Sequence, residues 1–203
     1  MPKPKKLTKP FYTNSDVLAI SKALLGQVLC TDINGKLCNG IIVETEAYNG
    51  RTDEGCHAYP NKRTKRTEVM YEQGGLAYVY LCYGIHNMLN IVCNTKGNAD
   101  CVLIRAVEPT EGIDVMLKRR NMKKLNKRLT MGPGSVGQAM GINLNHTGED
   151  LSGNCIWIEK QKSLVEEQIV IGPRVGMSKK ERPYAWYPWR FSIKDNHYVS
   201  KWR

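Results

Sequence analysis

The segments LAYVYLCY (residues 76–83), LNIVCN (89–94) and CVLIRAV (101–107) follow one another in a single stretch of the chain. Each has the length of a strand and contains the β-branched or aromatic residues that strands favour. The connections between them are too short for a crossover helix, so neighbouring strands must run antiparallel. This stretch therefore predicts the middle of a mostly antiparallel sheet.

The flanking sequence adds further strands and helices to this sheet. Asn34-Gly35 favours a tight turn between strands at 27–32 and 37–48, and residues 51–73 predict a long polar loop with one short helix. We expect helices at 16–25 (capped by Asn14-Ser15), 110–127 and 135–140, and strands at 155–159, 168–171 and 191–194. Together these elements predict an α+β fold: a basic flexible arm at residues 1–10, then a single compact domain at 11–203 with a curved, mostly antiparallel β-sheet and flanking helices.

The composition excludes several classes of protein. The chain has 203 residues, with 30 Lys and Arg against 19 Asp and Glu, and so a formal net charge of +11. Its longest apolar run, residues 76–83, is far shorter than the roughly 20 residues of a membrane span, and its lysine-rich start lacks the apolar core of a secretory signal. The seven cysteines lie at least eight residues apart, which argues against a structural zinc site and favours reduced thiols inside a cell.

Positive charge is concentrated in one internal segment. Residues 118–128 contain seven cations and no acid. A basic chain with clustered cations is typical of proteins that bind polyanions, so the charge favours nucleic acid as a partner. A solvated helix face is the alternative interpretation of this segment.

The strand GIIVETEAY (residues 40–48) carries two glutamates among apolar residues. Strict alternation directs Ile41, Val43, Thr45 and Ala47 to the core and Ile42, Glu44, Glu46 and Tyr48 to the opposite face. The two carboxylates either face water or lie in a partly desolvated cleft, where one of them could act as a general base. Carboxylates two residues apart in a strand are separated by roughly 7 Å, a spacing that inverting glycoside hydrolases also use.

Arg105 lies in the middle of the apolar segment 101–107, where a guanidinium needs an anionic partner. Glu46 or Glu44 is the expected partner. The pair is either an ordinary structural ion pair or part of a catalytic cleft, in which the arginine would hold the carboxylate ionised and help to hold a water.

Two tyrosines of the segment 76–83 are expected to differ in their surroundings. Tyr78 is expected in the core, as tyrosines in strands usually are. Tyr83 comes just before Gly84, where the strand can bend away. We expect Tyr83 to be exposed, as an aromatic that stacks on a base or wedges into a duplex must be.

An ordered series of motifs over about residues 11–200 resembles the alkyladenine (3-methyladenine) DNA glycosylases. The series consists of VETEAY (43–48), Asp53 with His57, YVY (78–80), Tyr83-Gly84, Asn90, CVLIR (101–105), Glu108-Pro109, Gly132-Pro133, RVG (174–176), PWRF (188–191), Asn196 and Val199-Ser200. The resemblance implies a monofunctional enzyme of base excision repair with a compact α+β fold. Such an enzyme flips alkylated or deaminated purines out of duplex DNA and hydrolyses the N-glycosidic bond, leaving an abasic site.

The resemblance also implies roles for particular residues. Glu46 looks like the general base that deprotonates the attacking water, which Arg105 and the backbone carbonyl of Val175 would share. Tyr83 resembles the side chain that intercalates into the duplex and fills the space of the flipped nucleotide. No lysine falls at the position of the water-activating group, so no lyase step is expected.

Four further residues resemble the binding pocket for the extruded base. Tyr48, His57 and Tyr80 look like its walls, and Asn90 looks like the residue that discriminates between purines. Neither a cofactor nor a metal is implied. The implied partner is double-stranded DNA containing damaged purines, bound by a monomer that makes no membrane contact. We expect it in the cytoplasm if the source is bacterial and in the nucleus if it is eukaryotic.

The chain departs from the family pattern at Thr67, Tyr71 and Asn87 and in the basic, aromatic segment 178–187, which concerns the range of substrates rather than the reaction. Two other functions stay open. One is a non-catalytic DNA- or RNA-binding module, because the family's sheet is similar to the C-terminal domain of methionyl-tRNA formyltransferase. The other is a sugar O-glycosidase built on Glu44 and Glu46, which would give no reason for the charge of +11.

Overall fold

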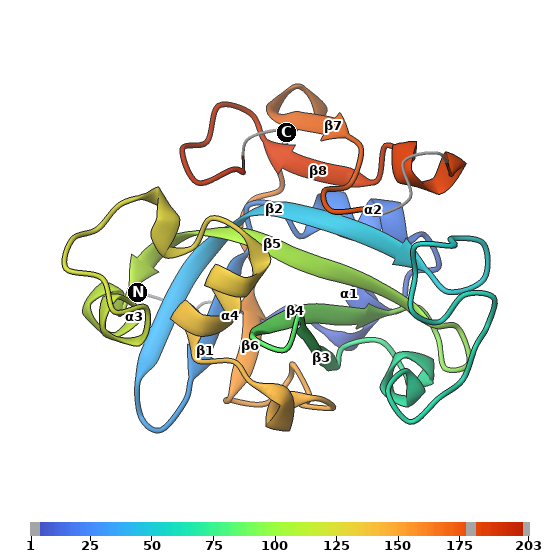
Figure 1. Cartoon of the computed structure of the whole chain (residues 1–203), viewed down its shortest axis with the longest axis horizontal. Coiled ribbons are helices and arrows are strands. Elements are labelled where there is room, and N and C mark those ends of the chain that lie inside the picture. Colours follow the sequence, from blue (N-terminus) through green and yellow to red (C-terminus); the bar gives the residue numbers. More distant parts are fainter. Residues whose placement is uncertain (1–4, 178–181, 201–203) are drawn as a thin grey trace.

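Eight strands form one antiparallel sheet within residues 5–177 and 182–200, the part of the chain that the computed structural model describes (Figure 1). The strands are β1 (Val28–Asp32), β2 (Leu37–Asn49), β3 (Ala77–Cys82), β4 (His86–Cys93), β5 (Asp100–Glu111), β6 (Ile156–Glu159), β7 (Ile169–Gly172) and β8 (Arg190–Ile193). Their order is β3-β4-β5-β2-β1-β6, and β8 pairs with both β2 and β7. All of these pairings are antiparallel, which confirms the predicted α+β fold.

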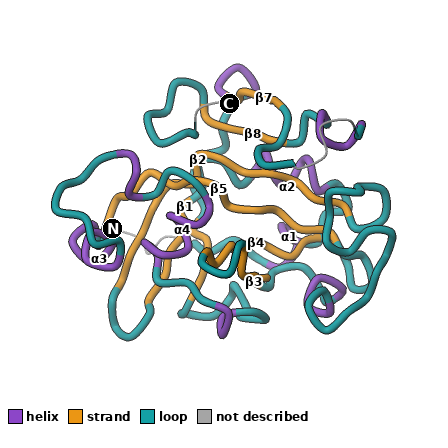
Figure 2. The backbone as a smooth tube through the Cα atoms, in the orientation of Figure 1, coloured by secondary structure: helices purple, strands orange, loops and turns teal. Residues whose placement is uncertain are grey.

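Short helices and long loops surround the sheet. The α-helices are α1 (Lys9–Tyr12), α2 (Val17–Ala23), α3 (Ile113–Arg119) and α4 (Pro133–Met140), and single turns of 3-10 helix cover Glu68–Tyr71, Lys127–Leu129, Leu144–His146, Glu166–Gln168 and Pro183–Trp186. Helix α2 packs on β2, and α4 packs on β4 and β5. Figure 2 shows the long loop between β2 and β3, whose one short helix agrees with the prediction for residues 51–73.

Helix α2 is shorter than the predicted helix at 16–25. The Asp16 carboxylate accepts hydrogen bonds from two backbone N–H groups of the first turn, so Asp16 is the N-cap and the predicted cap at Asn14-Ser15 is wrong. The Asn14 side chain instead accepts from the backbone N–H of Asp16 at 2.9 Å, just before the helix. Gly26, with a φ of 80°, then turns the chain toward β1.

The predicted helix at 110–127 is wrong over most of its length. Strand β5 continues through Glu111, and Gly112, with a φ of 71°, turns the chain into the short helix α3. Beyond α3, residues 120–126 form a loop. Cations on successive turns repel one another and have no acid of the segment to pair with, which explains why the helix does not continue.

The predicted turn at Asn34-Gly35 is confirmed. Both residues have positive φ (58° and 67°), as a type I′ turn between two strands requires. The other strands lie within a few residues of their predicted bounds, although β4 begins earlier, at His86, and β5 ends later, at Glu111.

A β-bulge in β2 changes the predicted side-chain pattern of residues 40–48. The pairing of β2 with β5 shifts register between Ile42 and Glu44. Ile42 therefore joins the main core, whereas Glu44 contacts Arg105 on the other face of the sheet. The expectation that Ile42 shares a face with the glutamates is wrong. Beyond the bulge the alternation holds, because Thr45 is hydrogen-bonded to Ser21 of α2 on the core side.

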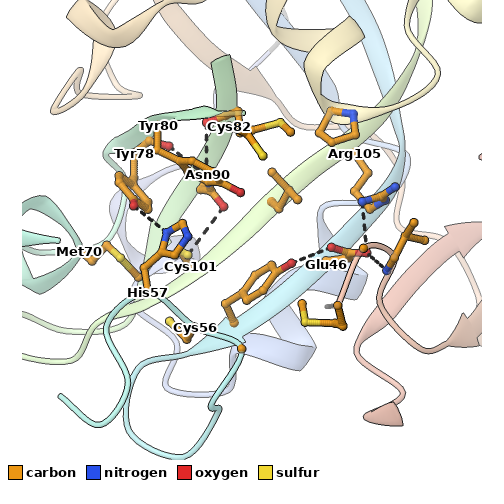
Figure 3. A pocket seen from close by; sticks show the side chains of 18 of the residues that line it. Glu46, Cys56, His57, Met70, Tyr78, Tyr80, Cys82, Asn90, Cys101 and Arg105 are labelled. Atoms are coloured by element: carbon orange, nitrogen blue, oxygen red, sulfur yellow. Dashed lines mark hydrogen bonds and ion pairs between the residues drawn. The ribbon is translucent and has the colours of Figure 1, made fainter. Parts of the chain in front are cut away.

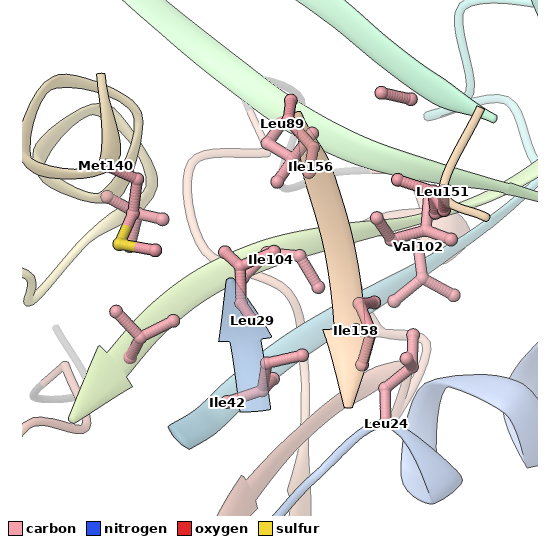
Figure 4. Close-up of a cluster of buried hydrophobic side chains, with 14 of the residues drawn as sticks. Leu24, Leu29, Ile42, Leu89, Val102, Ile104, Met140, Leu151, Ile156 and Ile158 are labelled. Atoms are coloured by element: carbon pink, nitrogen blue, oxygen red, sulfur yellow. The ribbon is translucent and has the colours of Figure 1, made fainter. Parts of the chain in front are cut away.

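The main core fills the face of the sheet that α2, α4 and the segment before β6 cover (Figure 4). Its fully buried members include Leu24, Leu29, Ile42, Leu89, Val102, Ile104, Met140, Leu151, Ile156 and Ile158. A second, smaller cluster packs the loop between β2 and β3 onto the sheet and contains Cys56, Ala58, Met70, Tyr71, Tyr78 and Cys101. This second cluster forms the support for the site described below.

Residues 5–7 of the expected basic arm lie along β6, residues 8–10 are exposed, and residues 1–4 lie outside the described residues. Lys6 forms a bridge with Glu159 of β6, its ammonium donates to Asn154 at 2.8 Å, and Leu7 is buried. The seven cysteines are free thiols. No helix in the described part of the chain is long and apolar enough to cross a membrane.

Candidate functional site

A cavity of about 420 Å³ lies on the face of β2, β3, β4 and β5 that is opposite the main core. Figure 3 shows Glu46 and Arg105 on one side of this cavity and His57, Tyr78 and Tyr80 on the other. The structure brings together all eight residues that the sequence singled out as site residues. They are Glu46, Tyr48, His57, Tyr80, Tyr83, Asn90, Arg105 and Val175.

Glu46 is fully buried and is held by three donors from three segments. Its Oε1 accepts from the backbone N–H of Val175 at 2.7 Å and lies 3.3 Å from Nη1 of Arg105, and its Oε2 accepts from the hydroxyl of Tyr48 at 2.8 Å. A carboxylate has about four acceptor positions. These contacts leave a position on Oε2 for a molecule in the cavity.

Glu44 occupies a different environment, although it is buried as completely as Glu46. Its carboxylate accepts from Arg105 Nε at 3.2 Å, from Arg190 Nη1 at 3.1 Å and from both the hydroxyl and the backbone N–H of Ser200. It does not line the cavity. The prediction that Arg105 pairs with a glutamate is confirmed for both glutamates, and the alternative in which both carboxylates face water is wrong.

A buried ion pair holds the segment that carries Val175. Asp53 and Arg174 are both fully buried, and the Arg174 Nη2 donates to Asp53 Oδ1 at 2.7 Å. The Arg174 guanidinium lies 4.6 Å from the centroid of the Tyr48 ring. One arginine therefore fixes both Tyr48 and the neighbouring Val175, the two uncharged donors to Glu46. The sequence drew attention to Asp53 and Arg174 without assigning them a role.

The other side of the cavity is aromatic. The His57 Nδ1 is 2.9 Å from the Tyr78 hydroxyl, and the His57 ring meets the Tyr80 ring edge-on with centroids 4.6 Å apart. Tyr78 is buried, as predicted, and its ring lies 5.7 Å from that of Tyr80. Burial raises the pKa of Tyr78 to about 12. At neutral pH this wall is therefore uncharged at its tyrosines.

Arg66, from the loop between β2 and β3, covers part of this aromatic wall. Its Nη2 lies 3.0 Å from His57 Nε2, and its guanidinium is 4.9 Å from the centroid of the Tyr80 ring. Burial and, second, the charge of Arg66 lower the pKa of His57 to about 4. Water moderates this effect, because part of the His57 side chain is exposed. Sequence reasoning missed Arg66, since nothing distinguishes it from the other cations of its loop.

Asn90 lies on β4 at the floor of the cavity and is buried. Its Nδ2 donates to the backbone carbonyls of Tyr78 at 3.2 Å and Met88 at 3.4 Å, and the Cys101 thiol lies 3.8 Å from its Oδ1. The amide is thus fixed by its own strand and by the neighbouring one. Its predicted part in discriminating between purines stays a prediction.

Tyr83 lies in the turn between β3 and β4, at the mouth of the cavity. It has a φ of 51° and is 87% exposed, so the predicted exposure is confirmed. Ile85, on the same turn, is 72% exposed and was not singled out from the sequence. An exposed apolar pair at a hairpin tip gains nothing from packing in the free protein.

Three of the departures from the family pattern, Thr67, Tyr71 and Asn87, do not line the cavity. Thr67 is buried and braces its loop by donating to the carbonyl of Lys62 at 3.0 Å. Tyr71 is buried in the second cluster, and Asn87 stands near the start of β4. In the basic segment, residues 178–181 lie outside the described residues, whereas Tyr184 lines the cavity.

Comparisons with known proteins show which family the chain belongs to. A family model described as "Methylpurine-DNA glycosylase (MPG)" matches residues 10–197. A protein of Chlamydia felis is 43% identical over 92% of this chain and 95% of its own length, and one of Desulfitobacterium hafniense is 43% identical over 97% and 98%. A protein of Clostridium acetobutylicum is 44% identical over 96% of this chain and 97% of its own length, and all three carry the name "Putative 3-methyladenine DNA glycosylase". The chain belongs to the methylpurine-DNA glycosylase family and is a DNA glycosylase.

Proposed function

We propose that this protein is a monofunctional DNA glycosylase of base excision repair, which extrudes alkylated or deaminated purines from duplex DNA and hydrolyses their N-glycosidic bonds. The observation that carries the proposal is the burial of Glu46, with three oriented donors, in the wall of a cavity whose other side is aromatic. A cavity of about 420 Å³ is also within the size range of sites for small ligands.

The aromatic side of the cavity supports base extrusion. A base inside a duplex is inaccessible, so it must leave the stack and be held elsewhere, at a cost of a few kcal/mol. Tyr48, His57 and Tyr80 offer ring faces and edges to an extruded base, and a purine alkylated on a ring nitrogen is cationic, which favours contact with aromatic faces. Tyr83 at the cavity mouth is free to enter the space that the base has left.

Glu46 supplies the base catalysis in this proposal. A water hydrogen-bonded to Oε2 attacks C1′ of the sugar while the bond from C1′ to the purine nitrogen breaks. Glu46 takes one proton from that water, the remaining hydroxyl forms the new bond to C1′, and the bonding electrons leave with the base. Arg105 holds Oε1 so that the carboxylate keeps its orientation. No step requires an amine nucleophile, so the DNA strand stays intact.

The two alternative functions have less support. A sugar O-glycosidase with two catalytic carboxylates needs both in the cleft, but Glu44 does not line the cavity and is engaged by Arg190 and Ser200. A binding module gives no reason for a buried glutamate with a free acceptor position in a cavity. Double-stranded DNA is the proposed partner, bound by one copy of the chain inside the cell.

The experiment is release of free base from duplex DNA. Oligonucleotides carrying 7-methylguanine, 3-methyladenine, ethenoadenine or hypoxanthine are incubated with excess protein, and the released base is separated by chromatography. We expect free base and an abasic strand that breaks only after hot alkali, with no protein–DNA adduct after borohydride reduction. Base retention on all four duplexes would refute the proposal, and strand cleavage or a trapped adduct would refute its monofunctional part.

A further inference from the structure

A second cavity, of about 600 Å³, lies in the loop between α3 and α4 and shares no lining residue with the cavity that contains Glu46. Its lining residues are Arg120, Met122, Lys123, Lys124, Asn126 and Arg128. We call these six residues the cationic cradle. Four of the six are cations. Three of these, Lys123, Lys124 and Arg128, are exposed and can contact a ligand.

Hydrogen bonds and buried side chains hold the loop that forms the cradle. Arg120 donates through Nη2 to the Ser135 hydroxyl of α4 at 3.1 Å and to the Arg128 carbonyl at 3.2 Å, and so joins both ends of the loop. Met122 packs against the main core, and Leu129 is fully buried in it. The loop is therefore pinned at both ends, and its lysines project from a fixed backbone.

The charges of the cradle lack acidic partners. None of its four cations forms an ion pair within residues 5–177 and 182–200. Nε of Arg120 is buried and has no hydrogen-bond partner in the described part of the chain. Burial and, second, the positive charge of the neighbouring Arg128 lower the pKa of Arg120. An anion placed here would relieve this repulsion.

The cradle is tied to the catalytic cavity through the first turn of α4. Pro133 of that turn lines the catalytic cavity, and Ser135 of the same turn accepts from Arg120 of the cradle. Figure 1 shows the loop running from α3 at the edge of the molecule back to α4. A DNA strand that places a base in the catalytic cavity would therefore pass near the cradle.

We infer that the cationic cradle binds backbone phosphates of duplex DNA on one flank of the flipped nucleotide. This inference rests on the proposed function, which supplies the duplex. Phosphate contacts fix the position of a protein on DNA without reading sequence, and each releases condensed counterions. The cradle would therefore contribute to affinity for undamaged and damaged DNA alike, with a strong dependence on salt.

The test is the salt dependence of binding to an undamaged duplex. The variant K123Q/K124Q/R128Q removes three charges of the cradle, and the control K36Q/K160Q/K162Q removes three charges elsewhere on the chain. The slope of log K against log[salt] changes by about 0.9 for each phosphate that the protein ceases to neutralise. We therefore expect the slope of the cradle variant to be smaller by about 2 to 3, and the control to keep the wild-type value. The charge-preserving variant K123R/K124R/R128K should restore the slope.

Equal slopes for wild type, cradle variant and control would overturn the inference. So would equal reductions in the cradle variant and the control, because that would indicate a general effect of net charge. The single variant K124Q, with an expected change of about 1 in slope, decides the matter if the triple variant does not fold. Base release by the wild-type protein is scored separately, so failure of the proposed glycosylase function is distinguishable from failure of the cradle.

Discussion

Replacing Arg105 with glutamine removes a cation that contacts both buried glutamates. Arg105 lies 3.2 Å from Glu44 and 3.3 Å from Glu46, and neither carboxylate is exposed. Removal of one partner from a buried ion pair costs about 3–5 kcal/mol. We expect the lower end of this range, about 3 kcal/mol, because each carboxylate keeps other donors. In a chain of this length that corresponds to a fall in Tm of roughly 6–12 °C.

The same change also tests whether Arg105 contributes to the reaction. Without the guanidinium the Glu46 carboxylate is freer to reorient, and a displacement of about 1 Å at a reacting group can cost about 100-fold in rate. Urea unfolding at pH 7 gives the stability, and single-turnover base release, corrected for the folded fraction, gives the rate. Arg190→Gln is the matched control, since Arg190 is an arginine of the same cluster that pairs with Glu44. If both variants are less stable and both keep the wild-type rate, Arg105 is a structural residue only.

Three further changes test other parts of the site. Tyr83→Ala should slow excision from a stably paired duplex more than excision opposite a mismatch, because stacking is worth about 1–3 kcal/mol per base; equal effects in single-turnover assays would exclude a role in flipping. Arg66→Gln should raise the pKa of His57 above about 4 but not to its ordinary value, since burial, the larger cause, persists; NMR titration of the ring measures this, and an unchanged value would contradict it. The pKa of His57 is about 4 in the folded protein, below the ordinary value of 6.5, so the folded state favours the neutral ring. This contribution to the free energy of unfolding is complete above pH 6.5 and is lost as the pH falls through about 4. Asp53→Asn should lower the rate of base release with little change in affinity for DNA, because it loosens Arg174, which fixes the donors to Glu46. A reduction in affinity alone would argue against this positioning role of Asp53.

The antiparallel sheet was predictable because its strands are dense in apolar residues and joined by short connections. The segments 76–83, 89–94 and 101–107 allow no crossover helix, and the structure shows β3, β4 and β5 as neighbours. The helix at 110–127 was not predictable in the same way. Lysine and arginine each have a high intrinsic helix propensity, so the segment favours a helix when its residues are considered singly. The mutual repulsion of its cations and the extension of β5 to Glu111 override that propensity.

The sequence predicts which residues form the candidate site but not how their side chains are arranged. Motif order pointed to Glu46 and Arg105, but alternation in a strand could not decide which glutamate lines the cavity. The bulge at residues 42–44 and the contacts of Glu44 with Arg190 and Ser200 decide it, and both depend on distant parts of the chain. The resemblance implies that the carbonyl of Val175 shares the water, which stays a prediction. The bond from the N–H of the same residue to Glu46 was not predicted from the sequence.

The change Glu46→Gln tests the central claim most directly, through the rate of base release from methylated duplex DNA under single-turnover conditions. Glutamine preserves the size of the side chain but cannot accept the proton, so the rate should fall by about 10²–10⁴-fold, while affinity for undamaged DNA stays at the wild-type value. Glu44→Gln, on the same strand and equally buried, should cost mainly stability. A Glu46→Gln protein that releases base at the wild-type rate would contradict the assignment of Glu46 as the general base.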